Sequence, residues 1–252
     1  MKKWILLLFV FSFSIGIAQN DVLFDSATKA YNEGNYQDAI DNYHEILKSG
    51  QHSAEVYFNL GNSYYKVNKI GPSIYYYEKA LLLDPNDAEI LSNLSFAQNM
   101  TIDAIEVMPQ TTISRMLASV KNILTFDQWA YTAVIFMFLF VLLYLAFYFF
   151  QFADKKRIAF IASMVCLFVM AISILFAVIQ YQDFTQTRPA IIFASETAVK
   201  DEPNNRSNTL FDLHEGSKVF VEEELNDWNK IRLADGKNGW IPATDLRMLK
   251  DF

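Results

Sequence analysis

The chain has 252 residues, of which 52% are hydrophobic, and its formal net charge is −7. The acidic balance leaves no basic face for nucleic acid, so we expect no nucleic-acid partner. The apolar residues gather near the N-terminus and in the middle of the chain, which argues against a single soluble domain. The one cysteine, Cys166, excludes an internal disulfide and is too few for a cysteine-based zinc or redox motif.

The first 18 residues have the pattern of a signal peptide. Lys2 and Lys3 precede an apolar stretch over residues 4–13, and Gly16 and Ala18 are small residues at the −3 and −1 positions of a cleavage site after Ala18. An uncleaved anchor is the alternative. Both interpretations export the segment that follows.

Residues 21–105 repeat themselves with the period of a tetratricopeptide array. Small residues recur at intervals of 34, at Ala27, Gly61 and Ser95, and Pro85 ends the second unit. We expect units at about 21–54 and 55–88, with a partial unit at 89–105 acting as a cap. Because about three repeats are usually needed for stability, a later segment or a partner is expected to complete the packing.

The resemblance to tetratricopeptide repeats implies a concave groove lined by the first helix of each repeat. Its side chains are mainly aromatic or amide, which suits an extended peptide more than a carboxylate clamp. The expected groove residues are Thr28, Tyr31, Phe58, Asn59, Asn62, Tyr65 and Asn93, and the same face also holds Phe24, Ser92 and Phe96. The alternative for Phe24 and Phe58 is packing between repeats.

Residues 110–126 are predicted to form an amphipathic helix. Ile113, Met116, Leu117 and Val120 recur at helical spacing, and Arg115 falls on the other face. We expect this helix to lie at a membrane–water boundary. Docking on the repeats is the alternative.

Two apolar runs predict a transmembrane hairpin, with helices at 129–150 and 158–180 joined by a loop at 151–157. Thr125 and Gln128 form a capping-box pattern at its start, and Trp129 is a typical interface anchor. The runs contain no ionisable residue, so the hairpin is predicted to anchor the chain and not to conduct. Small residues in the second run, including Ala159, Ser163 and Cys166, favour close packing of the two helices.

The expected orientation depends on Lys155, Lys156 and Arg157 in the short connection. Positive charge in a short loop favours the cytoplasmic side. The segments on both outer sides of the hairpin would then lie in the periplasm, with the chain in the inner membrane.

Residues 187–250 contain short alternating strands separated by Gly and Asp turns, which predicts a small all-β barrel. Asp235-Gly236 predicts a hairpin turn, and Lys200–Asn208 would be a variable loop. The order of strands and the segment Gly239–Pro242 resemble bacterial SH3-like domains. That resemblance implies a ligand face with Trp228, Trp240 and Pro242. In the alternative, Trp240 is core and Trp228 covers an edge.

No catalytic arrangement is evident. The three histidines, His44, His52 and His214, are scattered without zinc-ligand spacing, and His214 is expected to be solvated. Since no phosphate loop or nucleophile elbow is present either, we expect a protein that is not an enzyme and holds no cofactor or metal.

The expected fold class is therefore multidomain α plus β: helical repeats, a two-helix transmembrane hairpin and an SH3-like barrel. This order of modules resembles BatE-type proteins of the Bacteroides aerotolerance (Bat) operon. The resemblance implies a scaffold for von Willebrand A-domain proteins and a MoxR-type ATPase, linked to oxygen or stress tolerance. The alternative is a peptidoglycan-binding module with the repeats as a spacer.

Overall fold

The computed structural model describes residues 22–105 and 111–250. The predicted signal peptide at 1–18 lies outside these residues. The chain divides into two compact units. One, the repeat–sheet unit, comprises residues 1–108 and 188–252, and the other, the hairpin unit, comprises residues 109–187.

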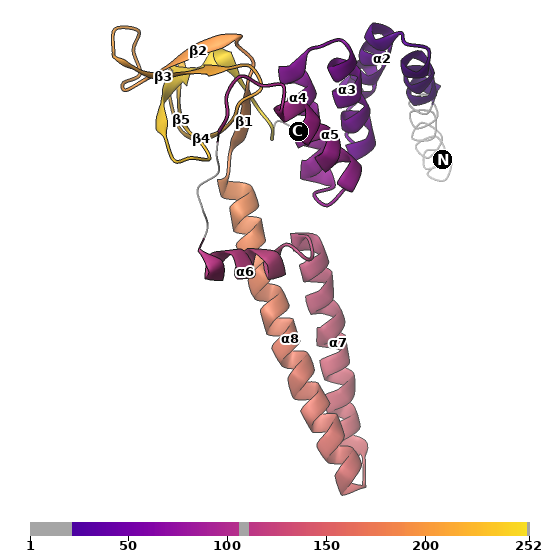
Figure 1. Cartoon of the computed structure of the whole chain (residues 1–252). Coiled ribbons are helices and arrows are strands. Elements are labelled where there is room, and N and C mark those ends of the chain that lie inside the picture. Colours follow the sequence, from indigo (N-terminus) through magenta and orange to yellow (C-terminus); the bar gives the residue numbers. More distant parts are fainter. Residues whose placement is uncertain (1–21, 106–110, 251–252) are drawn as a thin grey trace, which may run out of the picture. The chain divides into compact units, whose positions relative to one another are not determined.

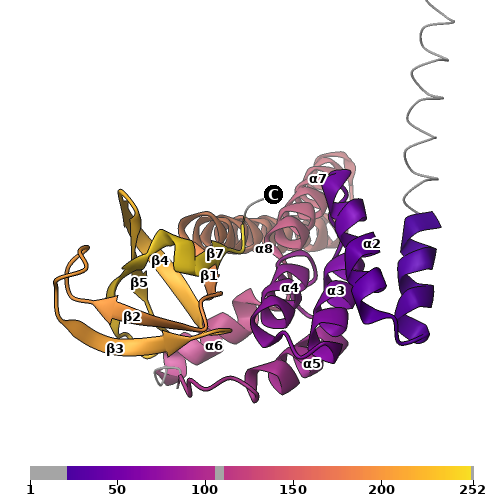
Figure 2. The same cartoon turned by 90° about the horizontal axis from the view of Figure 1, so that it is seen from above.

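The N-terminal part of the repeat–sheet unit is a stack of helices (Figures 1 and 2). A helix over residues 22–32 is followed by α2 (Tyr36–Lys48), α3 (Ala54–Lys66), α4 (Ile70–Leu83) and α5 (Ala88–Gln98). Ser53 caps α3, and the Asp87 carboxylate accepts from the amides of Glu89 and Ile90 at the start of α5. Asp87 is thus the N-cap of α5, two residues after the Pro85 that ends the second unit.

The helices pack small residues against large aromatic ones. Ala27 and Ala39 are fully buried, as are the rings of Tyr43 and Tyr57. A Cβ atom on Gly61 would lie 2.5 Å from the Tyr77 ring, so only glycine allows this approach of α3 and α4. The recurring small residues Ala27 and Gly61 thus lie at helix contacts, whereas Ser95 in the third unit is exposed. In α5 the buried residues are Ile90, Leu94 and Ala97.

The C-terminal part is a seven-stranded sheet, and every pair of neighbouring strands is antiparallel. The strand order is β3-β2-β6-β5-β4-β1-β7. The strands are β1 (Pro189–Ile192), β2 (Glu196–Lys200), β3 (Thr209–His214), β4 (Lys218–Leu225), β5 (Trp228–Arg232), β6 (Asn238–Pro242) and β7 (Leu246–Met248). A 3₁₀ turn, η1 (Ala243–Asp245), precedes β7.

The hairpin predicted at Asp235-Gly236 joins β5 and β6 and is confirmed. Gly236 has φ +90°, a left-handed conformation that glycine adopts without strain. Asn226, with φ +52°, supplies the same kind of turn between β4 and β5. Strand β1 was not predicted, and it is the strand that lies against the repeats.

The sheet and the repeats share one core. Ile191 of β1 and Leu249 after β7 are fully buried in the cluster formed by α2–α5. The Tyr75 ring on α4 meets Phe193 edge-on at 5.3 Å, and its hydroxyl donates to the Met248 carbonyl at 3.2 Å. The partial array is therefore completed by a later segment of the same chain.

Polar contacts reinforce this packing. Lys218 Nζ donates to the Glu78 carboxylate at 2.5 Å, and the Gly71 amide donates to Glu215 at 3.1 Å. Because the Glu78 side chain is almost fully buried, its charge is compensated by Lys218 and not by water.

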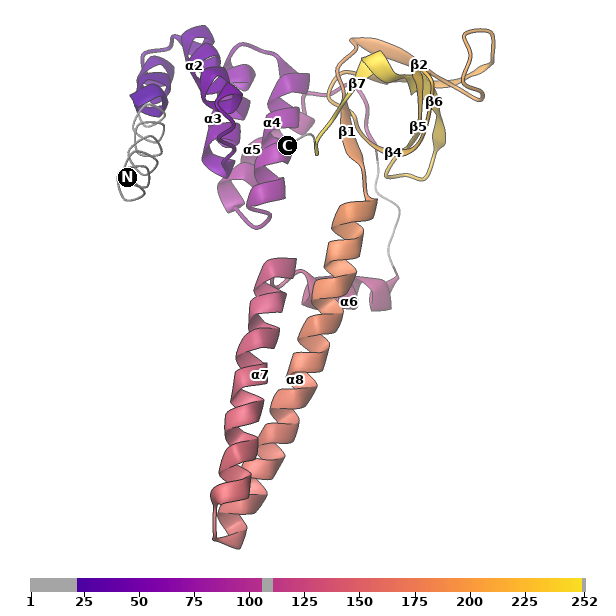
Figure 3. The same cartoon turned by 180° about the vertical axis from the view of Figure 1, so that it is seen from behind.

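The hairpin unit contains α6 (Thr112–Lys121), α7 (Phe126–Phe149) and α8 (Ala153–Gln186). Helices α7 and α8 lie side by side over the length of α7, and α6 runs crosswise to them beside α8 (Figures 1 and 3). The capping box at Thr125 and Gln128 is confirmed. Both helices are long and apolar enough to cross a membrane.

Small residues form the contact face of α8. Its buried residues are Ala159, Ser163, Cys166 and Ser173. The Ser163 hydroxyl donates to the Phe160 carbonyl at 2.7 Å, which satisfies it within the helix. This is the close packing that the sequence predicts.

The connection between the two helices is shorter than expected. Helix α7 ends at Phe149 and α8 begins at Ala153, so Lys155, Lys156 and Arg157 stand in the first turns of α8 instead of in a loop. The 34 residues of α8 extend over about 51 Å, which exceeds a hydrocarbon core of about 30 Å. Part of α8 must then lie beyond any membrane that it crosses.

Candidate functional site

The repeats enclose a pocket of about 190 Å³ between their first helices. Residue 31, helix α3 and helix α5 supply most of its wall. The lining residues are Tyr31, Asn62, Tyr65, Lys66, Tyr77, Asn93 and Phe96. The structure thus brings together four of the seven expected groove residues: Tyr31, Asn62, Tyr65 and Asn93.

A hydrogen-bond network fixes the floor of the pocket. The Asn62 side-chain oxygen accepts from the Tyr77 hydroxyl at 2.7 Å and from the Asn93 amide at 2.9 Å. Since Tyr77 is held in the core of the repeats, these bonds orient Asn62 and join α3, α4 and α5.

The pocket offers hydrogen-bond donors and flat aromatic surfaces. Burial raises the pKa of Tyr31, so its hydroxyl remains protonated at neutral pH and is a donor. The Tyr77 hydroxyl already donates to Asn62. Lys66 is exposed at the rim and contributes a positive charge. Such a surface can bind the backbone carbonyls and the side chains of an extended peptide.

Two of the lining residues, Lys66 and Tyr77, were not predicted. Tyr77 recurs in the repeat as a large core residue, and its hydroxyl reaches the pocket from the core. Lys66 lies one residue after Tyr65, at the end of α3, outside the expected set of aromatic and amide side chains.

The other expected groove residues have partners in the core. The Thr28 hydroxyl lies 3.1 Å from that of Tyr43, and Asn59 lies beside the same Tyr43 hydroxyl. Phe24 packs edge-on against Tyr43, and Phe58 packs against Tyr77 with ring centroids 5.9 Å apart. For Phe24 and Phe58 this is the alternative of packing between repeats.

A second surface lies on the β5–β6 hairpin. Trp228 is paired with Pro242 and Lys230 with Trp240, so these four side chains share one face of the hairpin. Lys230 Nζ lies 5.9 Å from the centroid of the Trp240 ring. Trp240 is buried, whereas Trp228 and Pro242 are half-buried.

The opposite face of that hairpin carries Ile231 and Ile241, which lie in the core of the sheet. The three expected ligand-face residues are therefore neighbours on the outer face. The most accessible aromatic surface among them is that of Trp228.

An ionic cluster that was not expected joins the end of the repeats to the sheet. The Asp103 carboxylate accepts from the His214 amide at 2.7 Å, from His214 Nδ1 at 2.8 Å and from the Ser217 hydroxyl. The prediction of a solvated His214 is wrong. No local sequence pattern predicts the cluster, because Asp103 lies more than a hundred residues before His214 and Ser217 in the chain.

The cluster shifts both titratable groups. The hydrogen bond to Asp103 raises the pKa of His214. Burial by itself would raise the pKa of Asp103, but the hydrogen bonds from Ser217 and His214 outweigh it and leave that pKa below its ordinary value. The Ser217 hydroxyl bonds to the carboxylate and not to the imidazole, so the arrangement is a structural clasp and lacks the geometry of a nucleophilic triad.

At the far end of the hairpin unit, the three expected orientation residues follow the tight connection. Lys155 Nζ lies 5.2 Å from the centroid of the Phe152 ring, and Lys156 Nζ lies 5.9 Å from that of Phe147. Within the described residues, no group of three or more His, Cys, Asp or Glu side chains is placed to hold a metal ion.

Comparison with known families gives one match. The tetratricopeptide-repeat family model matches residues 54–87, which span α3, α4 and the turn before α5. No curated protein matches the chain. The helical part of the chain thus contains a tetratricopeptide repeat, a non-catalytic motif of protein–protein interaction.

Proposed function

We propose that this protein is a membrane-anchored scaffold whose repeats hold an extended segment of a partner protein. The observation that carries the proposal is the pocket lined by Tyr31, Asn62, Tyr65 and Asn93, in a stack of helices that contains a tetratricopeptide repeat. The two apolar helices supply the anchor. The chain contributes recognition and position, and we assign it no chemistry of its own.

A photo-crosslinking residue in the pocket tests the proposal. Placed at the exposed Phe96, it should capture a defined partner in intact membranes, and Lys66→Ala or Asn93→Ala should reduce that capture several-fold. Lys69→Ala is the matched control, because Lys69 is exposed at the start of α4 and does not line the pocket. If the partner is captured equally by all three variants, the pocket is not the binding site for the partner segment.

The partners that we propose follow from the order of the modules. The repeats, the apolar hairpin and a sheet resembling an SH3-like barrel are arranged as in BatE-type proteins of the Bacteroides aerotolerance operon. On that resemblance, the segment held in the groove belongs to a von Willebrand A-domain protein that works with a MoxR-type ATPase in oxygen or stress tolerance. Co-purification of the full chain with such a protein is the direct measurement.

The proposed location is the inner membrane, with the repeats and the sheet in the periplasm. The three cations at positions 155–157 support this orientation through the positive-inside rule. Single cysteines at positions 51, 155 and 205, in a Cys166→Ser background, can be labelled from outside the cell. Labelling at 51 and 205 alone is expected, whereas labelling at 155 alone would reverse the orientation.

A second candidate function rests on the outer face of the β5–β6 hairpin, where Trp228, Trp240, Pro242 and Lys230 are neighbours. Such a face can stack on peptidoglycan fragments. The solubilised full chain should then co-sediment with purified wall, and Trp228→Ala should abolish it. Because the sheet shares its core with the repeats, this test uses the whole chain.

A further inference from the structure

Helix α6 exposes a continuous apolar stripe. Ile113, Met116, Leu117 and Val120 recur at helical spacing and are between 45% and 73% exposed. None of the ten residues of α6 is buried by any other residue that the structure describes. An exposed stripe of this kind marks an interaction surface.

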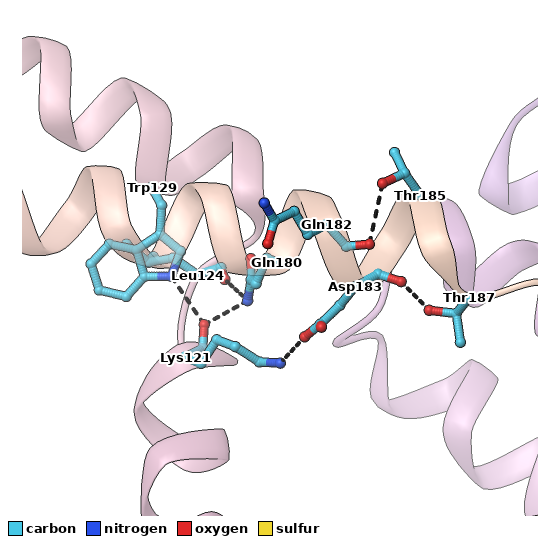
Figure 4. Close-up of polar contacts among 8 residues, drawn as sticks. All are labelled: Lys121, Leu124, Trp129, Gln180, Gln182, Asp183, Thr185 and Thr187. Carbon is cyan, nitrogen blue, oxygen red and sulfur yellow. Dashed lines mark hydrogen bonds and ion pairs between the residues drawn. The ribbon is translucent and has the colours of Figure 1, made fainter.

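A polar junction fixes one end of this helix to the hairpin (Figure 4). The Lys121 carbonyl accepts from Trp129 Nε1 at 3.0 Å and from Gln180 Nε2 at 2.6 Å. The same Gln180 amide donates to the Leu124 carbonyl at 3.0 Å, and Lys121 Nζ bonds to the Asp183 carboxylate at 2.5 Å. The last turn of α6 is thus tied to both α7 and α8.

The junction lies where the apolar part of the hairpin ends. The apolar run of α8 covers residues 158–179, and Gln180, Gln182 and Asp183 follow it directly. On α7, Trp129 stands immediately before the run that begins at residue 130. Tryptophan side chains gather at membrane–water interfaces, and a carboxylate is costly below that level. The junction therefore marks the boundary of the bilayer.

We propose that α6 lies flat in this boundary, with its apolar stripe inserted among the lipid acyl chains. The inference rests on the proposed membrane anchorage. Because α6 runs crosswise to the axes of α7 and α8, a hairpin that crosses the bilayer directs α6 along its surface (Figures 1 and 3). Arg115 on the opposite face and Lys121 at the junction fit anionic headgroups at the same level.

Depth-dependent quenching tests this proposal on the full chain. Environment-sensitive fluorophores are attached to Leu117→Cys on the stripe and to Ser119→Cys, in a Cys166→Ala background. Two residues turn an α-helix by about 200°, so these positions face opposite sides. The protein is reconstituted in vesicles of phosphatidylcholine and phosphatidylglycerol, with acyl-chain spin labels as the lipid quencher and iodide as the aqueous one.

A third label at Phe138→Cys, exposed in the middle of α7, reports on the anchor itself. The labels at 138 and 117 should be quenched several-fold more strongly by the lipid spin labels than by iodide. The label at 119 should show the reverse. Lipid quenching at 138 with equal responses at 117 and 119 would overturn the α6 proposal and leave the anchor intact. It would also favour docking of α6 on the repeats or on another protein. Iodide quenching at 138 would overturn the anchor, and the α6 proposal with it.

Discussion

At the scale of single residues, Gly61 shows how one missing side chain sets the repeat geometry. Alanine in its place would gain about 1 kcal/mol of helix propensity. The added Cβ atom, however, would lie 2.5 Å from the ring of Tyr77, which is almost fully buried among the helices of the repeats. Overpacking of this kind costs about 1–3 kcal/mol, from which the gain in helix propensity is subtracted, so we expect Gly61→Ala to destabilise the repeats by up to about 2 kcal/mol.

Thermal unfolding of the detergent-solubilised protein measures this effect. Ser95→Ala is the matched control, because Ser95 holds the corresponding place in the third unit and its side chain is exposed. It should change the free energy of unfolding by less than about 0.5 kcal/mol. An unchanged melting temperature in Gly61→Ala would show that Tyr77 can shift.

The clasp of Asp103 and His214 makes stability depend on pH. The pKa of His214 is raised in the folded protein. The stabilisation that His214 gives to the folded state is therefore complete below its unfolded pKa of about 6.5, and it is lost as the pH rises through the higher folded pKa. The pKa of Asp103 is lowered, so its contribution is present above its unfolded pKa of about 3.9 and is lost as the pH falls through the folded one. The clasp should therefore stabilise most between about pH 4 and 6.5.

We expect the melting temperature of the wild type to exceed that of His214→Gln at pH 6, and this difference to shrink by pH 8.5. His44, whose pKa is lowered by burial, makes stability change with pH in the opposite direction. Because His44 is present in both proteins, its effect cancels in the difference between the two melting temperatures. A difference that stays constant over this range would mean that the clasp does not titrate.

Residues that act through local patterns were predictable, and residues that act through distant contacts were not. The small positions Ala27 and Gly61 follow from their period in the repeat, and both are buried. The partnership of Asp103 and His214 is set by how the sheet docks, which no short stretch of sequence encodes. The candidate pocket was predictable in part. The repeat pattern placed Asn62 and Asn93 on the same face, but it could not predict the hydrogen bond between their side chains.

At the scale of elements, the junction at Gln180 controls the position of α6. Gln180→Leu keeps the size of the side chain and removes the donor to the Lys121 and Leu124 carbonyls. Lost hydrogen bonds of this kind cost about 1–2 kcal/mol, so amide hydrogen exchange in residues 112–124 should quicken by about tenfold. Gln182→Leu is the control, because its side chain is exposed two residues away. Equal exchange in the two variants would show that Gln180 does not hold α6.

The elements themselves were recognisable where their signal is local. Apolar length predicts α7 and α8, and Asp235-Gly236 predicts the β5–β6 turn. The predicted connection between α7 and α8 was too long. Three consecutive cations suggested a loop, but charged side chains are equally compatible with the solvated first turns of a helix, and here they lie in α8. Strand β1 was missed because its short apolar segment directly follows α8 and is buried by a distant part of the chain.

At the scale of the whole molecule, the shared core predicts that the repeats and the sheet unfold together. Leu249, beyond the last strand, is fully buried in the core of the repeats. Leu249→Ala should cost about 2–5 kcal/mol, and the loss should reach α4 although the change lies at the other end of the sequence. Hydrogen exchange of α4 amides should therefore quicken by at least tenfold, together with that of β1.

Leu225→Ala is the matched control for this last prediction, because Leu225 ends β4 and is 44% exposed. It should leave exchange in α4 unchanged. Faster exchange confined to the sheet in Leu249→Ala, with α4 still protected, would show two independent folding units. Faster exchange in both α4 and β1 would show that the repeats and the sheet unfold as one unit. A ligand that binds the repeats would then stabilise the sheet as well. Binding at either surface of the repeat–sheet unit would then increase the stability of the other.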